Sequence, residues 1–173
     1  SINIGRYTGG GQEFTGYISN LRMVYGTAVY TGTSLTIPTQ PITAVTGTVL
    51  LTCQSGRFTD NGPNALAITK FGDTSTQKFS PFATVTQTPN THSVYFDGSG
   101  DYLTLPSSSA FSMGTGDFTI EAWVYTTTSN TQRVISATGN NFELLLINTG
   151  SNVYLNWYDG VGDTTSGTNY VPQ

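Results

Sequence analysis

The sequence is poor in charged residues. They make up 9% of the 173 positions, against about 25% in typical soluble proteins. The six Lys and Arg are scattered and the net charge is −4, which argues against nucleic-acid binding because phosphate contacts need clustered cations. Long solvent-exposed helices are also excluded, because their outer faces need abundant Lys, Arg and Glu.

Cysteine and long apolar runs are scarce as well. Cys53 is the only cysteine, so no intrachain disulfide can form, and a lone thiol in an apolar segment is expected to pack as a small buried group. The longest aliphatic run covers residues 144–147, which is far too short to cross a bilayer. We therefore expect no membrane span and a fold that its core alone holds together.

What the chain has in abundance is typical of β-structure. Thr, Ser, Gly and Asn are frequent, and aromatic residues reach 12%. Short β-type segments recur between Gly, Asn, Asp and Pro residues, a spacing that predicts an all-β antiparallel sandwich. The predicted strands cover residues 17–25, 48–52, 65–71, 93–96, 102–105, 117–125, 133–137, 142–147 and 153–158.

Two of these segments alternate clearly. Phe118, Ile120, Ala122 and Val124 share one face of their strand, and Thr119, Glu121, Trp123 and Tyr125 the other. Since side chains alternate along a strand, the first set is expected to face the core. Val153, Leu155 and Trp157 oppose Tyr154, Asn156 and Tyr158 in the same way. Residues 142–147 are apolar nearly throughout, as in a central strand covered on both sides.

Two longer motifs carry a resemblance to a known family. Residues 93–106 read SVYFDGSGDYLTLP, and residues 111–125 read FSMGTGDFTIEAWVY. Together they resemble the opening half of laminin-G-like, concanavalin A-like lectin and glucanase domains, which implies a jelly-roll β-sandwich. Residues 49–53, 58–61 and 65–69 are similar to the first strands of that family, whereas residues 16–30 are similar to its closing strands.

The resembling segments occur in reverse order along the chain. Residues 1–45 resemble the closing strands and a connector, and residues 46–173 resemble the opening and middle strands. Either the chain holds the end of one tandem repeat and most of the next, which we favour, or the segments fold back into one sandwich. The segments LLTCQS and SNLR are similar to segments of structural proteins of marine bacteriophages. We therefore expect a segment of a longer virion or extracellular protein.

One glycine-rich turn carries two carboxylates. Asp97-Gly-Ser-Gly-Asp101 suits a hard cation such as calcium, which takes several oxygen ligands, and it equally suits a plain hairpin turn. Asp60, with Asn61 and Asn64, is expected to contribute if the first turn lies beside it, and related domains often bind calcium near this level. The candidate metal ligands are thus Asp97, Asp101 and Asp60, and the candidate cofactor is calcium.

A second spacing of the same kind, Asp159-Gly-Val-Gly-Asp163, is interpreted as a loop.

Aromatic residues near the end of the chain are the candidates for sugar stacking. Aromatic faces offer a large contact area at little entropic cost, and we select Trp157, Tyr158 and Tyr154 as carbohydrate-binding residues. Trp123 and Tyr125 are further candidates. Core packing is the competing role for all of them.

The sequence lacks a catalytic constellation. A glycosidase needs two carboxylates set roughly 5 to 9 Å apart, but Glu121 and Glu143 each lack an acidic neighbour at strand spacing. His92, the single histidine, precedes a predicted strand, where a packing or surface role is expected. We predict no catalytic residue and no enzyme.

The expected function is a structural or adhesion module of a virion or extracellular appendage, with other copies of the assembly and surface glycans as partners. A calcium-dependent carbohydrate-binding module is the alternative, and a glycoside hydrolase a distant one.

Overall fold

The structure is a computed structural model that describes residues 1–82, 90–112, 114–138, 142–150, 152–159 and 163–165, with backbone alone for 163–165. Strands dominate it, and the only helix in these ranges is one turn of 3₁₀ type at Ser109–Phe111. The strands are β1 Ile2–Ile4, β2 Thr15–Tyr25, β3 Thr48–Thr52, β4 Thr69–Phe71, β5 Ser75–Gln77, β6 Ser93–Asp97, β7 Tyr102–Leu105, β8 Phe118–Tyr125, β9 Thr131–Ala137, β10 Glu143–Asn148, β11 Val153–Tyr158 and β12 Asp163–Thr165.

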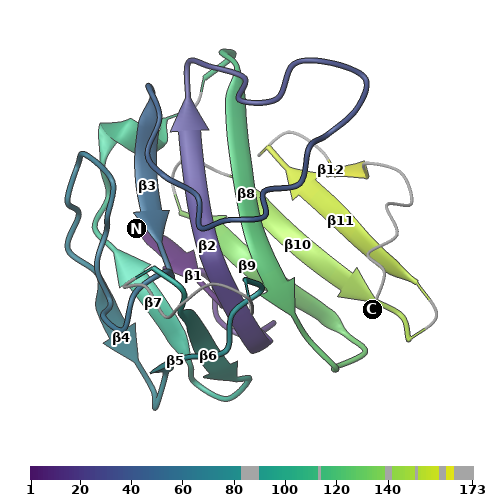
Figure 1. Ribbon diagram of the computed structural model, residues 1–173. Coiled ribbons are helices and arrows are strands. Elements are labelled where there is room, and N and C mark those ends of the chain that lie inside the picture. The colour runs from purple at the N-terminus through teal and green to yellow at the C-terminus, as the bar shows by residue number, and fades with distance from the viewer. Residues whose placement is uncertain (83–89, 113, 139–141, 151, 160–162, 166–173) are drawn as a thin grey trace.

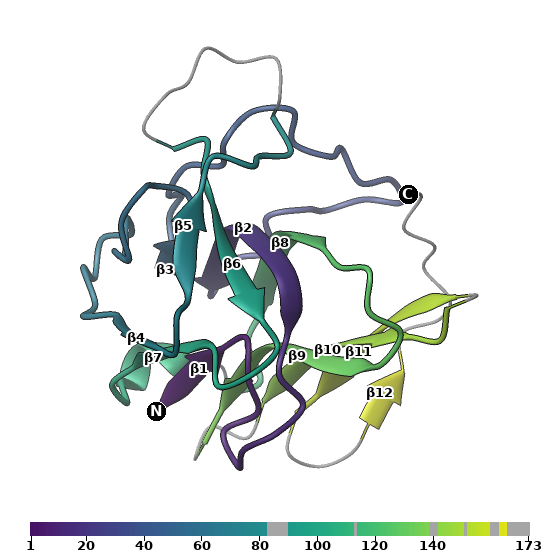
Figure 2. The same ribbon diagram turned by 90° about the horizontal axis from the view of Figure 1, so that it is seen from below.

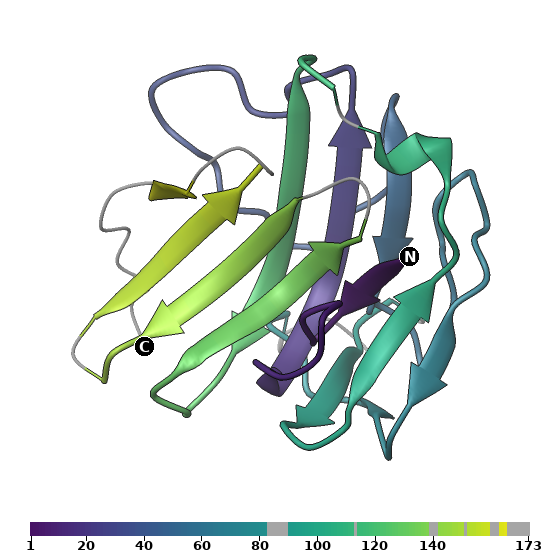
Figure 3. The ribbon, with the colours of Figure 1, turned by 180° about the vertical axis from the view of Figure 1, so that it is seen from behind.

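The strands form two sheets that pack face to face (Figure 2). Sheet A has the order β12-β11-β10-β9-β1-β7-β4, which can be followed from behind in Figure 3. Sheet B has the order β3-β2-β6-β5, and β8 pairs with the other edge of β2. All the described pairings are antiparallel. The fold is the antiparallel β-sandwich that the composition and strand spacing predict, and it is consistent with the concanavalin A-like arrangement that the resemblance implies.

Strand β2 is the hub of sheet B. One edge of it pairs with β8, while the other pairs first with β6 and then with β3 (Figure 1). The register with β8 shifts between Ser19 and Arg22, where Asn20 has φ +53°. The Asn20 side chain accepts hydrogen bonds from the Ile42 amide at 3.0 Å and from Gln54 Nε2 at 2.7 Å. The long connection from β2 to β3 is thereby tied to the sheet.

The core lies between the sheets and is built from alternate residues. Ile18 of β2, Val94 of β6 and Leu103 of β7 are at most 1% exposed. Ile120, Ala122 and Val124 of β8 pack against this core, as their alternation predicts. Packing the sheets together removes the apolar side chains of both sheets from water, so the two layers stabilise each other.

Phe118 meets this prediction in part. It is 39% exposed, because it lies at the end of β8, yet its ring centroid is 4.9 Å from that of Trp157 in sheet A. Leu145 and Leu146 of β10 are both buried although they face opposite ways, but the other residues of that strand are only half-buried.

The remaining predicted strands differ from the structure in identifiable places. Of residues 65–71 only β4 is a strand, because Ala65 has φ +45° and its amide bonds to Gly62 O in a turn. The sequence did not predict β1, β5 or β12, each three residues long.

The N-terminal segment is part of the same two sheets as the rest of the chain. Strand β1 lies between β7 and β9 in sheet A, and β2 is the hub of sheet B. The segments that resemble closing strands and opening strands thus share one core in this chain.

Candidate functional site

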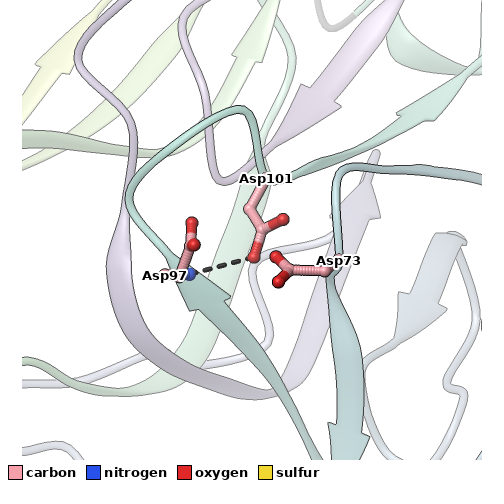
Figure 4. A group of neighbouring side chains, drawn as sticks. All are labelled: Asp73, Asp97 and Asp101. Carbon is pink, nitrogen blue, oxygen red and sulfur yellow. Dashed lines mark hydrogen bonds between the residues drawn. The ribbon is translucent and has the colours of Figure 1, made fainter.

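Two connections between the sheets lie side by side at one end of the sandwich. One joins β4 of sheet A to β5 of sheet B, and the other joins β6 of sheet B to β7 of sheet A. Since β4 pairs with β7 and β5 with β6, the two connections must meet. Asp73 lies on the first, and Asp97 and Asp101 flank the second (Figure 4).

The three carboxylates form a compact group. Oxygen atoms of Asp73, Asp97 and Asp101, one from each, all lie within 4.8 Å of one another. Asp101 Oδ2 accepts a hydrogen bond from the Asp97 amide at 2.9 Å, and Asp97 Oδ1 accepts one from the Ser99 amide at 2.7 Å. Asp73 and Asp97 are exposed, whereas Asp101 is fully buried.

Asp101 is the strained member of this acidic group. Its Oδ1 atom is buried and has no hydrogen-bond partner in the part of the chain that the structure describes. Burial raises the pKa of Asp101 above its ordinary value of 3.8, and the neighbouring charges of Asp97 and Asp73 raise it further, while the Asp97 amide offsets part of the effect. The charged form of Asp101 is therefore stabilised by the Asp97 amide at Oδ2, and by no other described residue at Oδ1.

No cation of the chain neutralises the acidic group. All six Lys and Arg lie in the described ranges, and their salt bridges join Arg6 to Glu13, Arg22 to Glu121 and Arg133 to Glu143. None of these six side chains forms a salt bridge with Asp73, Asp97 or Asp101. Several carboxylate oxygens without a cationic side chain are the ligand set that calcium prefers.

Gly72 leaves room beside the buried carboxylate. It has φ +68°, and a Cβ atom there would overlap Asp101 Oδ1 and crowd the Gly100 carbonyl oxygen. The orphaned oxygen therefore faces a small space that only glycine leaves open. The residues fit a divalent cation: three carboxylates supply the charge, and the Gly100 carbonyl is a nearby oxygen.

Asp60 has a different environment from the one predicted for it. Its Oδ1 atom accepts hydrogen bonds from the amides of Leu51 and Gly62, at 3.0 and 2.8 Å, and its Oδ2 atom accepts one from Leu66 at 2.9 Å. It does not belong to the acidic group. These bonds shape the turn after β3, so both carboxylate oxygens of Asp60 are engaged by backbone amides.

The two neighbours that were expected to assist Asp60 also bond within the protein. Asn64 Nδ2 donates to Val49 O at 2.9 Å, and Asn61 Nδ2 donates to Gln54 Oε1 at 3.3 Å. In the second glycine-rich spacing, Asp159 is exposed, residues 160–162 lie outside the described residues, and Asp163 is described by its backbone alone.

The three aromatic residues predicted to bind sugar do not share a face. Trp157 packs into the sandwich, with ring centroids 5.5 Å from Phe142 and 4.9 Å from Phe118. Tyr154 and Tyr158 point to the outer face of sheet A and are half-buried. The structure thus does not bring Trp157 together with the two tyrosines.

The two strand glutamates point to opposite outer faces of the sandwich. Glu121 bonds to Arg22 Nε at 2.7 Å and to Tyr30 Oη at 2.5 Å, whereas Glu143 bonds to Arg133 Nε at 2.8 Å. Two carboxylates on opposite faces cannot act on one glycosidic bond.

Cys53 directly follows β3 and is buried, whereas His92 directly precedes β6 and is half-buried. Burial raises the pKa of the Cys53 thiol to about 12, so the thiol stays protonated at neutral pH, as in a packing role. The His92 backbone bridges Gln54 O and the Ser19 hydroxyl.

Comparison with known proteins gives one match. The family described as the concanavalin A-like lectin/glucanases superfamily matches residues 97–173, which is less than half of the chain and begins at Asp97 of the acidic group. No curated protein and no solved structure matches the chain. Within the described residues no helix has the length and hydropathy for a membrane span.

Domains of the matched kind are usually extracellular and typically non-catalytic. Together with the antiparallel sandwich, the match suggests a carbohydrate-binding or adhesion-type module, and the acidic group is a place where such a module could hold a metal ion.

Proposed function

We propose that this chain is a non-catalytic adhesion module of a virion or extracellular appendage, and that calcium bound by Asp73, Asp97 and Asp101 fixes one end of its sandwich. The observation that carries the proposal is the buried Asp101 Oδ1 atom, which has no partner and lies beside two further carboxylates. Leaving a buried charge uncompensated costs several kcal/mol in general, so such groups pair or bind metals.

Calcium suits this site better than a softer ion. The group offers oxygen atoms alone, and the exposed Asp73 and Asp97 leave one side for water, which completes the coordination of Ca²⁺ in many proteins. When bound, the ion would supply the positive charge that the surrounding residues lack. It would link the β4–β5 connection to the β6–β7 connection and so hold both sheets together at this end.

Two observations support a role in recognition rather than catalysis. The match to the lectin/glucanase superfamily begins at Asp97. The strand glutamates Glu121 and Glu143 form salt bridges with arginines and are not paired with each other. The resemblance to phage structural proteins supports a place in a larger assembly, with other copies or subunits as partners.

A second candidate is calcium-dependent carbohydrate binding, which the same match supports. A glycoside hydrolase would be supported only by hydrolysis of a β-glucan that disappears in a Glu121→Gln variant.

Direct calorimetry tests the calcium site. Titration of the metal-free chain with CaCl₂ should show one site, which Asp73→Asn and Asp97→Asn each weaken by about tenfold or more, since each removes a charged ligand. Asp117→Asn is the matched control, because Asp117 is exposed and outside the acidic group. Absence of heat with CaCl₂, or an equal loss in the Asp117 variant, would refute the proposal.

A further inference from the structure

The outer face of sheet B carries a row of tyrosines. Tyr95, Tyr17 and Tyr125 are cross-strand partners on β6, β2 and β8. The ring centroid of Tyr17 lies 5.0 Å from that of Tyr95 and 6.2 Å from that of Tyr125. Phe79, which follows β5, adds a ring 4.5 Å from Tyr17 and 5.4 Å from Tyr125. Four aromatic rings therefore meet outside the core.

Two of these rings are unusually open to solvent. Phe79 is 49% exposed and Tyr125 is 53% exposed, although large apolar surfaces normally leave water when a chain folds. Exposed aromatic groups of this kind mark binding surfaces more often than plain surface residues do. The tyrosine row is thus a candidate binding surface.

A cavity lies directly beside the row. It has a volume of about 160 Å³, and its lining includes Tyr17, Phe79, Trp123 and Tyr125. Trp123 is the partner of Ser19 in the β2–β8 register and forms the next aromatic wall. The volume equals that of several water molecules, which suits one sugar ring rather than a folded segment of another protein.

The cavity also has an unsatisfied polar group. Ser93 lines it and is 1% exposed, and its buried hydroxyl oxygen has no hydrogen-bond partner among the residues that the structure describes. By contrast, the Ser19 hydroxyl, which lines the same cavity, donates to His92 O at 2.7 Å and accepts from Asn20 Nδ2 at 2.9 Å. A buried hydroxyl without a partner is costly, and a ligand hydroxyl would satisfy it.

The cavity has no charge to offer an ionic ligand. Among the described residues no Lys, Arg, Asp or Glu lines it, and even Lys78, the neighbour of Phe79 in the chain, is not one of its lining residues. Burying a carboxylate or sulfate without a cationic partner is unfavourable. A ligand must therefore be neutral, with an apolar face for the rings and hydroxyls for Ser93.

We propose that this cavity binds one neutral hexopyranose ring of a glycan, stacked on Tyr125 and Trp123 and hydrogen-bonded to Ser93 Oγ. Such a ring combines an apolar C–H face with hydroxyl groups at its rim. Sialic acids and uronic acids are disfavoured by their charge. The inference deepens the proposed adhesion role, and it assigns sugar recognition to sheet B rather than to Tyr154 and Tyr158 of sheet A.

Saturation-transfer NMR on the whole chain tests the proposal. The probes are the α- and β-methyl glycosides of glucose, galactose, mannose and N-acetylglucosamine at millimolar concentration, with lactose and 3′-sialyllactose as a matched neutral and acidic pair. At least one neutral probe should bind. Tyr125→Ala should weaken its binding by about tenfold and Ser93→Ala by about fivefold. Tyr154→Ala, the matched control, should leave it unchanged.

Several results would overturn the inference: no transfer to any methyl glycoside, affinities unchanged in both Tyr125→Ala and Ser93→Ala, an equal loss in Tyr154→Ala, or tighter binding of 3′-sialyllactose than of lactose. Circular dichroism checks that each variant is folded. If the chain binds calcium but no glycoside, the proposed calcium site stands and the sugar site is refuted. If it binds a glycoside in EDTA but gives no heat with CaCl₂, the sugar site stands and the calcium site is refuted.

Discussion

Replacing Asp101 with Asn should change stability in opposite directions with and without calcium. In metal-free protein the wild-type carboxylate is buried beside Asp73 and Asp97, with Oδ1 unpaired. Asparagine removes that charge, keeps an oxygen for the Asp97 amide, and gives the Asp73 carboxylate a donor. With calcium present, the same change removes a charged ligand.

The size of each effect follows from the environment of Asp101. A buried polar group without a partner costs roughly 1–3 kcal/mol, so Asp101→Asn should gain about 1 kcal/mol in EDTA. A ligand at a hundredfold excess over its Kd stabilises the folded state by about 2.7 kcal/mol. In a chain of this length that corresponds to a rise in Tm of about 5–10 °C, which the variant should lack.

The pH dependence gives an independent check on the same residue. Because the pKa of Asp101 is raised in the folded state, the folded metal-free protein holds more protons than the unfolded chain between pH 3.8 and the raised value. The free energy of unfolding therefore falls as the pH rises through that window. Asp101→Asn should remove this contribution, and calcium should oppose it by favouring the charged carboxylate.

Thermal unfolding followed by circular dichroism measures all of these effects. Wild type, Asp101→Asn and the control Asp117→Asn are each melted in EDTA, CaCl₂ and MgCl₂ across the pH range. A wild-type Tm that calcium leaves unchanged, a variant that still responds to calcium, or a variant less stable than wild type in EDTA would each refute the reasoning.

Three further variants test the frame around the sites. Asn20→Ala should cost about 3 kcal/mol, since it removes several buried hydrogen bonds, whereas Asn20→Gly should cost about 1 kcal/mol less because glycine tolerates the positive φ; denaturant titration compares them. Glu121→Gln should lower the free energy of unfolding by about 2 kcal/mol. It should also lower the pKa of Tyr30 from about 12, though not to its ordinary value, because burial is the largest cause of the raised pKa. Absorbance titration of the phenol measures this, and an unchanged pKa would contradict the contact between Tyr30 and Glu121. Residues 46–173 alone should fail to form a monomeric, cooperatively unfolding sandwich because they lack β2; size-exclusion chromatography and melting would show otherwise.

Composition, the spacing of short β-type segments and alternation together were enough to predict the sandwich and most of its strands. The faces of 118–125 and 153–158 follow directly from period-2 patterning, and Trp157 lies in the core face as that pattern requires. The three-residue strands β1, β5 and β12 were not predictable in the same way, because three residues are too few to show a period. They are strands because longer neighbours offer them backbone partners.

The acidic group was predictable only in its local part. Asp97 and Asp101 are joined by a short glycine-rich turn that the sequence displays openly. Asp73 reaches them because β4 pairs with β7 and β5 with β6, and strand pairing between distant segments leaves no mark at Asp73 itself. Its position after Gly72, in a turn, is the only local signal that existed.

The two proposed sites share strand β6, and its geometry decides how far they should influence each other. Ser93 begins the strand and Asp97 ends it, so the sites lie about 13 Å apart at about 3.3 Å per residue. A calcium ion at Asp97 cannot therefore touch a sugar at Ser93. Val94 and Phe96 are at most 1% exposed, so the core fixes the strand without help from the ion.

Coupling between binding sites is reciprocal and requires two alternative states, and this buried strand offers little room for a second. Below the melting temperature, EDTA should change the affinity for a neutral glycoside by less than about twofold. Titration of the glycoside by NMR in EDTA and in CaCl₂ measures this, and complete loss of sugar binding in EDTA would instead favour an ion-bridged, calcium-dependent lectin.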